Sequence, residues 1–214
     1  MTGLLDLLEW FNRKERFFLV GEALGNPRFR LSAEFRAKVA AEMGIEVPAD
    51  AFAAMDYHLD WLAVSLHLAT AGVDGTAPCA NAAGLVTGNQ EDVDLLVAFA
   101  EPASSRATYI ILIEAKVESP WTNTQMESKA ERLRGIFGHD GRKHAGVSPN
   151  FMLMSPSRPQ RLRVSDWPAW MTREGKVPWL PLTAFTGRRR VTRCTPDGRP
   201  AEDGSHFRVR TKNG

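Results

Sequence analysis

One stretch of the sequence leaves few alternatives to a buried β-strand. Residues 108–113 read Thr-Tyr-Ile-Ile-Leu-Ile, a nearly continuous β-branched and aromatic run. Such runs are typical of strands that are covered on both faces of a sheet. A second apolar run, residues 93–99, precedes it, and the segment 101–107 between them holds a proline and two serines, as hairpin loops do. The sequence therefore predicts two neighbouring central strands.

Apolar residues at helical spacing predict helices on either side of these strands. The expected helices cover residues 4–11, 13–23, 33–43 with Ser32 as N-cap, 51–71, and the segment after Thr122 or Thr124. Further short strands are expected at 84–88 and 151–154. The order α-β-β-β-α-β predicts an α/β fold, with a mixed central sheet flanked by helices, N-terminal helices and an irregular basic C-terminal region.

Length and composition are those of a soluble globular protein. With 214 residues, 43% hydrophobic and 24% charged, residues 1–214 suit a single domain. Within it we expect a helical extension at 1–48, the core at 49–156 and a Trp-, Pro- and Arg-rich region at 157–214. The two cysteines lack metal-ligand spacing, and no signal peptide or long apolar segment is found, so we expect a cytoplasmic protein with no membrane partner.

The candidate catalytic residues lie where the two central strands are expected to meet. Asp94 stands at the start of one strand, and Glu114-Ala115-Lys116 ends the next. In a hairpin these positions can lie side by side at one end of the sheet, with Glu114 and Lys116 on one face. Two carboxylates can hold Mg²⁺, the backbone carbonyl of Ala115 can complete its shell, and a lysine can stabilise a phosphate or orient a water.

The tripeptide Glu-x-Lys is by itself a weak signal. It also occurs as Glu127-Ser128-Lys129 inside a predicted helix and as Glu174-Gly175-Lys176 in a region without a predicted strand. Only the first copy ends an apolar strand that follows a strand with a leading aspartate. The alternative for Asp94, Glu114 and Lys116 is a cross-strand ion pair, which explains one acid and one lysine but not a second acid.

The residues Glu91-Asp92-Val93-Asp94-Leu95-Leu96-Val97 and Ile110-Ile111-Leu112-Ile113-Glu114-Ala115-Lys116 resemble the motif of the PD-(D/E)XK nuclease superfamily, which has the restriction-endonuclease-like fold. The resemblance covers roughly residues 50–155, and Val93 replaces the proline of the motif. It implies Asp94 and Glu114 as metal ligands and Lys116 as the catalytic lysine.

The same resemblance implies two additional positions. Family members often carry another acid on the helix before the first strand, and Asp60 is preferred here over Asp56 as a metal ligand. They also carry a Gln or a basic residue on the helix after the Glu-x-Lys strand, where Gln125 fits a catalytic role and Lys129 and Arg132 follow along a similar face as nucleic-acid contacts. The alternatives are that the aspartates are solvated or pair with a neighbouring arginine, and that Gln125 forms a capping box with Thr122.

The C-terminal region is basic. Residues 158–214 hold 13 Lys or Arg against 5 Asp or Glu, and they include Arg188, Arg189 and Arg190. Such a segment is compatible with a polyanion, here DNA, or with a solvated tail. Three tryptophans, Trp167, Trp170 and Trp179, could stack on bases, but packing in a small satellite core or an oligomer interface is the favoured interpretation.

These features predict a nuclease that uses Mg²⁺ or Mn²⁺ to hydrolyse phosphodiester bonds in DNA, as an endonuclease of the restriction, repair or defence type. RNA is a second option for the substrate, and a homodimer is compatible with this class of protein. Two alternatives use the same fold without catalysis: a nucleic-acid-binding module that has no activity, and a protein-interaction subunit that docks a partner through its tail and tryptophans.

Overall fold

The computed structural model describes residues 3–11, 14–26, 29–89, 91–101, 107–117, 119–183 and 189–211. The chain forms two compact units, Met1–Pro181 and Leu182–Gly214. The first unit holds α1 (Leu4–Phe11), α2 (Glu15–Leu24), α3 (Ala33–Met43), β1 (Phe52–His58), α4 (Leu59–Ala71), β2 (Asp92–Ala100), β3 (Thr108–Ala115), α5 (Asn123–Phe137), β4 (Val147–Ser155), the 3₁₀ turn η1 (Ala169–Met171) and β5 (Trp179–Pro181). The second holds β6 (Arg189–Cys194) and β7 (His206–Thr211). In the described residues, no helix has the length and apolar character needed to cross a membrane.

The fold is α/β, as predicted, and is built on a five-stranded mixed sheet in the order β1-β2-β3-β4-β5. β1, β2 and β3 form an antiparallel meander, whereas β3, β4 and β5 are parallel neighbours. Parallel neighbours need a crossover connection, and α5 supplies it between β3 and β4. The two strands predicted from the apolar runs, β2 and β3, lie next to each other as expected, and β3 is the central strand.

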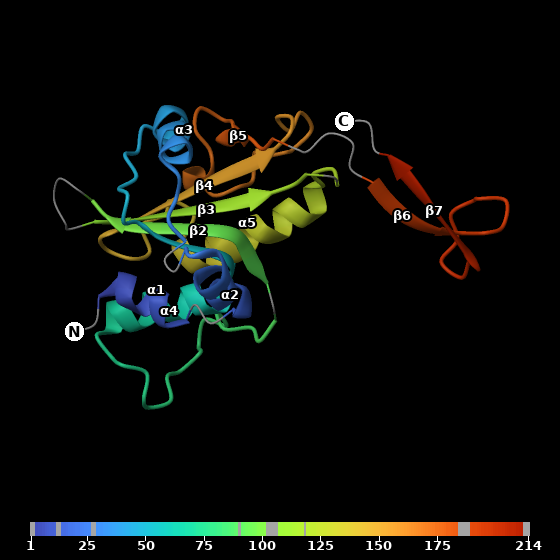
Figure 1. The fold of residues 1–214 in the computed structure, drawn as a ribbon. Helices are drawn as coiled ribbons and strands as arrows, with labels where there is room; N and C mark the ends of the chain where they lie inside the picture. Colours follow the sequence, from blue (N-terminus) through green and yellow to red (C-terminus); the bar gives the residue numbers. More distant parts are fainter. Residues whose placement is uncertain are drawn as a thin grey trace. The chain divides into compact units, whose positions relative to one another are not determined.

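Helices cover both faces of the sheet (Figure 1). One face, called the α5 face below, packs against α1, α4 and α5 through a core that includes Leu8, Leu62, Leu66, Leu96, Leu112, Leu133 and Phe151. The other face, called the α3 face, packs against α3 through Val39, Met43, Val97, Ile111, Ile113 and Met152. β3 contributes to both cores through alternate residues, which explains its unbroken apolar run.

The N-terminal helices form part of these layers. Tyr57 is fully buried and its hydroxyl donates a 2.8 Å hydrogen bond to the carbonyl of Leu8, which ties α1 to β1. α3 has the predicted limits, because the Ser32 hydroxyl accepts from the backbone N–H of Phe35 and Gly44 ends the helix in the left-handed conformation at φ 64°. Within the described part of residues 1–48, α1 and α3 therefore cover opposite faces of the sheet.

The predicted helix over residues 51–71 is wrong in its first half. Residues 52–58 form β1 at the edge of the sheet, and the helix begins only at Leu59. Asp56 adopts a left-handed conformation, with φ 47°, inside this strand. As a result Ala54 and Tyr57, three residues apart, both reach the α5 core. The predicted helix rested on the spacing of Phe52 and Met55, but Met55 is 43% exposed and pairs with Leu95 in the sheet.

The same kink affects β2. Met55 pairs with Leu95 and Tyr57 pairs with Val93, so Asp56 lies opposite Asp94. Val93 and Leu96, again three apart, both belong to the α5 core. The regular alternation of β2 is therefore interrupted at the position of the candidate catalytic acid. Local distortions of this kind are over-represented beside active sites.

Two other predictions need correction. Residues 84–88 form a loop instead of a strand, and the C-terminal region is less irregular than expected, because β6 and β7 pair there as an antiparallel hairpin. Residues 157–181 belong to the first unit, where Trp167 is buried in the α5 core and Trp170 and Trp179 pack against it. The favoured interpretation of the tryptophans as packing residues is confirmed.

The tip of the hairpin depends on a close backbone approach. A Cβ on Gly204 would lie 2.3 Å from the carbonyl oxygen of Cys194, so only glycine fits there. The side chain of Arg193 donates to the carbonyl of Gly204 at 2.6 Å, and the segment 195–204 folds back over Cys194, which is buried. The second unit is thus organised by its own contacts.

Candidate active site

The structure brings Asp94 and Glu114 together. The β2–β3 ladder pairs Leu95 with Ile113, and one more step in the same register sets Asp94 opposite Glu114. The Asp94 carboxylate accepts a 2.6 Å hydrogen bond, through Oδ2, from the backbone N–H of Ala115. This bond fixes one oxygen of Asp94 at the end of β3, and among the described residues Oδ1 has no hydrogen-bond partner.

Glu114 is a buried acid. Its side chain follows Ile110 and Leu112 on the α5 face, and the residue is only 5% exposed. Burial raises the pKa of its carboxyl to about 7, the ammonium of Lys129 opposes this rise, and the charges of Asp94 and Asp92 add to it. A carboxylate that is buried close to two other acids favours a cation in its neighbourhood.

Lys129 is the cation that the structure places there. Its Nζ lies 3.1 Å from Oε1 of Glu114 and 3.8 Å from Oε1 of Glu91, and it also donates to the backbone carbonyl of Asp92. The side chain is 9% exposed. Sequence reasoning assigned Lys129 to nucleic-acid contact, but its ammonium is directed into the acidic cluster and away from open surface.

Lys116 occupies a different setting. It follows the last residue of β3, its backbone N–H donates to the carbonyl of Met154 at 2.8 Å, and its side chain is half-buried. Among the residues that the structure describes, no hydrogen bond or ion pair of its ammonium is found. Lys116 is therefore available to a ligand near the end of β3, whereas Lys129 is already paired.

Gln125 is at the start of α5 and exposed. The Thr122 hydroxyl accepts from the backbone N–H of Gln125 at 3.3 Å, so Thr122 is the N-cap of this helix. This contact confirms one half of the proposed capping box. Gln125 precedes Lys129 by one turn, and no contact within the described chain holds its side chain.

Asp60 lies in the first turn of α4, where it organises the loop 84–88. Its carboxylate accepts from the backbone N–H of Thr87 and of Gly88, from the Thr87 hydroxyl, and from Arg132 at 2.5 Å. Burial opposes its ionisation, but these hydrogen bonds and the Arg132 charge outweigh burial and lower the pKa of Asp60. The carboxylate and Arg132 thus have structural partners, as the alternative of an aspartate–arginine pair proposed.

Asp56 also has an arginine partner, and it comes from α2. The Asp56 carboxylate forms an ion pair with Arg16. Because Asp56 is in β1 and Asp60 is in α4, the two aspartates do not share a helix face as the sequence analysis assumed. Asp60 is linked to Glu114 only indirectly, because Arg132 also lies 4.0 Å from Glu91, which contacts Lys129.

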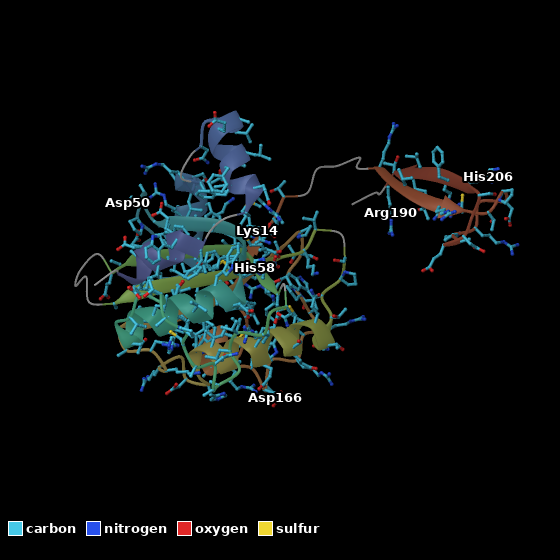
Figure 2. The ribbon with its side chains drawn as sticks, turned by 90° about the horizontal axis from the view of Figure 1, so that it is seen from below. Lys14, Asp50, His58, Asp166, Arg190 and His206 are labelled. Atoms are coloured by element: carbon cyan, nitrogen blue, oxygen red, sulfur yellow. The ribbon has the colours of Figure 1, made fainter. Side chains whose placement is uncertain are left out.

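Four residues of this region were missed by sequence reasoning. Asp92 pairs with Lys14 at 3.8 Å and is the strand partner of His58, and Glu91 contacts Lys129. Figure 2 shows Lys14 and His58 next to each other, and burial followed by the Lys14 charge lowers the pKa of His58. The acidic spacing of Glu91, Asp92 and Asp94 was visible in the sequence, but nothing there could place Lys14 and His58.

The donor atoms suit a hard divalent cation. Asp94 and Glu114 offer carboxylate oxygens, and Ala115, which directly follows Glu114 in sequence, offers its backbone carbonyl. Oε1 of Glu114 is buried and lacks a hydrogen bond of good geometry, although the Lys129 ammonium is close. Within the described ranges no three His, Cys, Asp or Glu side chains converge on one point, so a metal held here would take water or substrate oxygens as further ligands.

The basic residues at 188–190 all belong to the second unit, Leu182–Gly214. Arg188 lies outside the described residues, whereas Arg189 and Arg190 open β6 and are exposed. Comparison of the chain with protein-family models, with curated proteins and with solved structures gave no match.

The raised pKa of Glu114 predicts how stability depends on pH. The folded state holds this proton more tightly than the unfolded chain, because the pKa is about 7 in the fold against an ordinary 4.5. In EDTA, the free energy of unfolding should therefore fall as pH rises through this window, by up to about 3 kcal/mol relative to Glu114→Gln. Urea denaturation at pH 5 and pH 8 measures this fall in the free energy of unfolding.

Glu127→Gln, at an exposed position of α5, is the matched control. If wild type and Glu114→Gln showed the same dependence of stability on pH, Glu114 would not be the group with the raised pKa.

Proposed function

We propose that this chain is a metal-dependent nuclease that hydrolyses DNA, with Asp94 and Glu114 as ligands of Mg²⁺ or Mn²⁺. The observation that carries the proposal is the pair of acids in register on β2 and β3, one of them buried, beside the strand kink at Asp56. Buried acids with a raised pKa in such a setting are candidates for catalysis. The resemblance to the PD-(D/E)XK superfamily implies the same two acids.

Each residue has a separate task in this proposal. A bound Mg²⁺ would supply a water of lowered pKa and charge stabilisation for a phosphate oxygen. The hydrogen bond from Ala115 N–H orients Asp94 so that Oδ1 is free for a ligand. Lys129 holds the Glu114 carboxylate in place and favours its charged form against the effect of burial. Lys116, whose ammonium is unpaired in the described chain, contacts the scissile phosphate or orients the attacking water.

A second candidate function draws support from the Glu114–Lys129 contact. A lysine ammonium 3.1 Å from a buried carboxylate can neutralise it permanently. The chain would then be a DNA-binding module without catalysis, in which Lys129 takes the role of the cation. The two candidates differ in metal binding, because only the nuclease requires that Mg²⁺ or Mn²⁺ join Glu114.

The test is cleavage of supercoiled plasmid DNA and of a labelled RNA, in Mg²⁺, in Mn²⁺ and in EDTA, with calorimetric titration of Mn²⁺ in parallel. We expect Mn²⁺ binding and nicked or linear DNA only with metal. If neither the wild-type protein nor the Lys129→Met variant bound Mn²⁺, and no DNA were cleaved, the nuclease proposal would be rejected. The DNA-binding module without catalysis would then be favoured.

A further inference from the structure

The β6–β7 hairpin has two different faces. Strand pairing sets Val191 opposite Val209 and Arg193 opposite Phe207 on one face. The apolar members of this face are exposed: 67% for Val191, 73% for Phe207 and 50% for Val209. We call these three residues the apolar face of the hairpin.

The opposite face is basic. Arg190 lies opposite Arg210. Arg208, two residues before Arg210 in β7 and opposite Thr192, is on the same face. Arg190 and Arg210 are exposed, and among the described residues neither has an ion-pair partner. Figure 2 shows Arg190 near the open end of the hairpin and His206 near its tip.

The exposed apolar and basic side chains of this hairpin indicate that it binds a partner. An isolated two-stranded ribbon is only marginally stable in water, and a row of exposed apolar side chains adds an unfavourable contact with solvent. Residues 182–214 hold eight Lys or Arg and three Asp or Glu. All three acids, Asp197, Glu202 and Asp203, belong to the tip between the strands. The open end is therefore basic, and a second copy would be repelled by the same charge.

Duplex DNA is the polyanion whose shape matches this ribbon. The major groove of B-form DNA admits a two-stranded β-ribbon, whereas the major groove of duplex RNA is too deep and narrow for side chains to read. Base edges in the DNA major groove include the methyl group of thymine, which accepts apolar contacts from side chains such as Phe. The phosphate backbones rise on both sides of a ribbon that lies in the groove, so the long side chains of arginines on its outer face can bend over the strand edges to reach them.

We propose that the β6–β7 hairpin binds the major groove of duplex DNA, with its apolar face toward thymine methyl groups. Arg190 and Arg210, on the outer face, would bend over the strand edges to the phosphates, and Arg189, on the same side as the apolar face, would reach a phosphate at the open end. The proposal rests on the proposed function only in taking DNA as the substrate. It assigns the substrate contact to the second unit and gives the exposed apolar face a ligand of defined chemistry.

The experiment measures binding of the full-length protein to a fluorescent 20-base-pair duplex by anisotropy, in EDTA, over a range of salt concentrations. For Arg190→Gln/Arg210→Gln we expect the slope of log K against log salt to decrease in magnitude by about 2, because two phosphate contacts are lost. Arg190→Lys/Arg210→Lys, which keeps the charge, should retain most of that slope. Arg199→Gln is the matched control, because Arg199 is at the tip and paired with Asp197.

A second arm tests the apolar face. Replacing every thymine by deoxyuridine removes the methyl groups, and we expect wild-type affinity to fall about fivefold or more. Phe207→Ser should bind the thymine duplex more weakly and should no longer distinguish it from the deoxyuridine duplex. An RNA duplex of the same sequence should bind less tightly than the DNA.

Several outcomes would overturn this inference. They are unchanged slopes in the double glutamine variant, equal effects of deoxyuridine on wild type and Phe207→Ser, stronger binding of RNA, or loss of a dimer in Phe207→Ser without loss of DNA binding. Since EDTA prevents metal-dependent cleavage, none of these outcomes depends on the Asp94–Glu114 site. A protein that binds through the hairpin but cuts no DNA in Mg²⁺ would refute the nuclease alone.

Discussion

Glu114→Gln is expected to reduce metal-dependent DNA cleavage by about 10³-fold while the protein remains folded. Glutamine has nearly the shape of glutamate, so the packing against β2 and α5 is kept, but the amide is a poor metal ligand. The rate of plasmid nicking under single-turnover conditions is the measurement, and a circular-dichroism melt monitors the fold.

The matched control for this prediction is Glu127→Gln. Glu127 begins the second Glu-x-Lys tripeptide, and its side chain is exposed and paired with Arg163. The substitution is chemically identical, so a loss confined to Glu114 would reflect its position at the end of β3. Cleavage by Glu114→Gln at the wild-type rate would remove this acid, and the site built around it, from the reaction.

Lys129→Met is expected to destabilise the fold by about 3 kcal/mol at pH 8, because it leaves the buried Glu114 carboxylate without its cation. The stem of methionine fills a similar volume, so the loss reports charge more than packing. Adding Glu114→Gln to Lys129→Met should restore most of the stability, since the double variant buries no unpaired charge. Urea denaturation of the wild type, both single variants and the double variant completes the cycle.

Lys116→Met is the control for this cycle. Lys116 is half-buried, and within the described residues its ammonium has no partner, so the substitution should change the free energy of unfolding by less than about 0.5 kcal/mol. Equal losses in Lys129→Met and Lys116→Met would show that the Glu114–Lys129 contact does not stabilise the fold. If the stability changes of Lys129→Met and Glu114→Gln simply add in the double variant, the same conclusion follows.

The sequence predicted the centre of the sheet well because β2 and β3 are long, apolar and close together in the chain. The cap of α3 at Ser32 and that of α5 at Thr122 were also predictable, since capping depends on residues within one turn. β1 was not predictable by periodicity. Phe52 and Met55 have the spacing of a helix and continue the apolar stripe of α4, although Met55 is 43% exposed in the strand.

The candidate site was only partly predictable for a different reason. Asp94 and Glu114 follow from two strands joined by a short loop, so their neighbourhood is a local property of the chain. Lys129 reaches Glu114 only because α5 crosses between β3 and β4, and Lys14 reaches Asp92 from before α2. Contacts of this kind depend on how layers stack, which spacing in a sequence does not encode.

The kink at Asp56 has a consequence for the solubility of the chain. β1 is the outer strand of the sheet, and a straight outer strand is a template on which another chain can form hydrogen bonds. A left-handed residue breaks the regular order of backbone donors and acceptors, and the charged pair of Asp56 with Arg16 stands at that point. The distortion beside the candidate site thus also protects this border of the sheet against strand addition and aggregation.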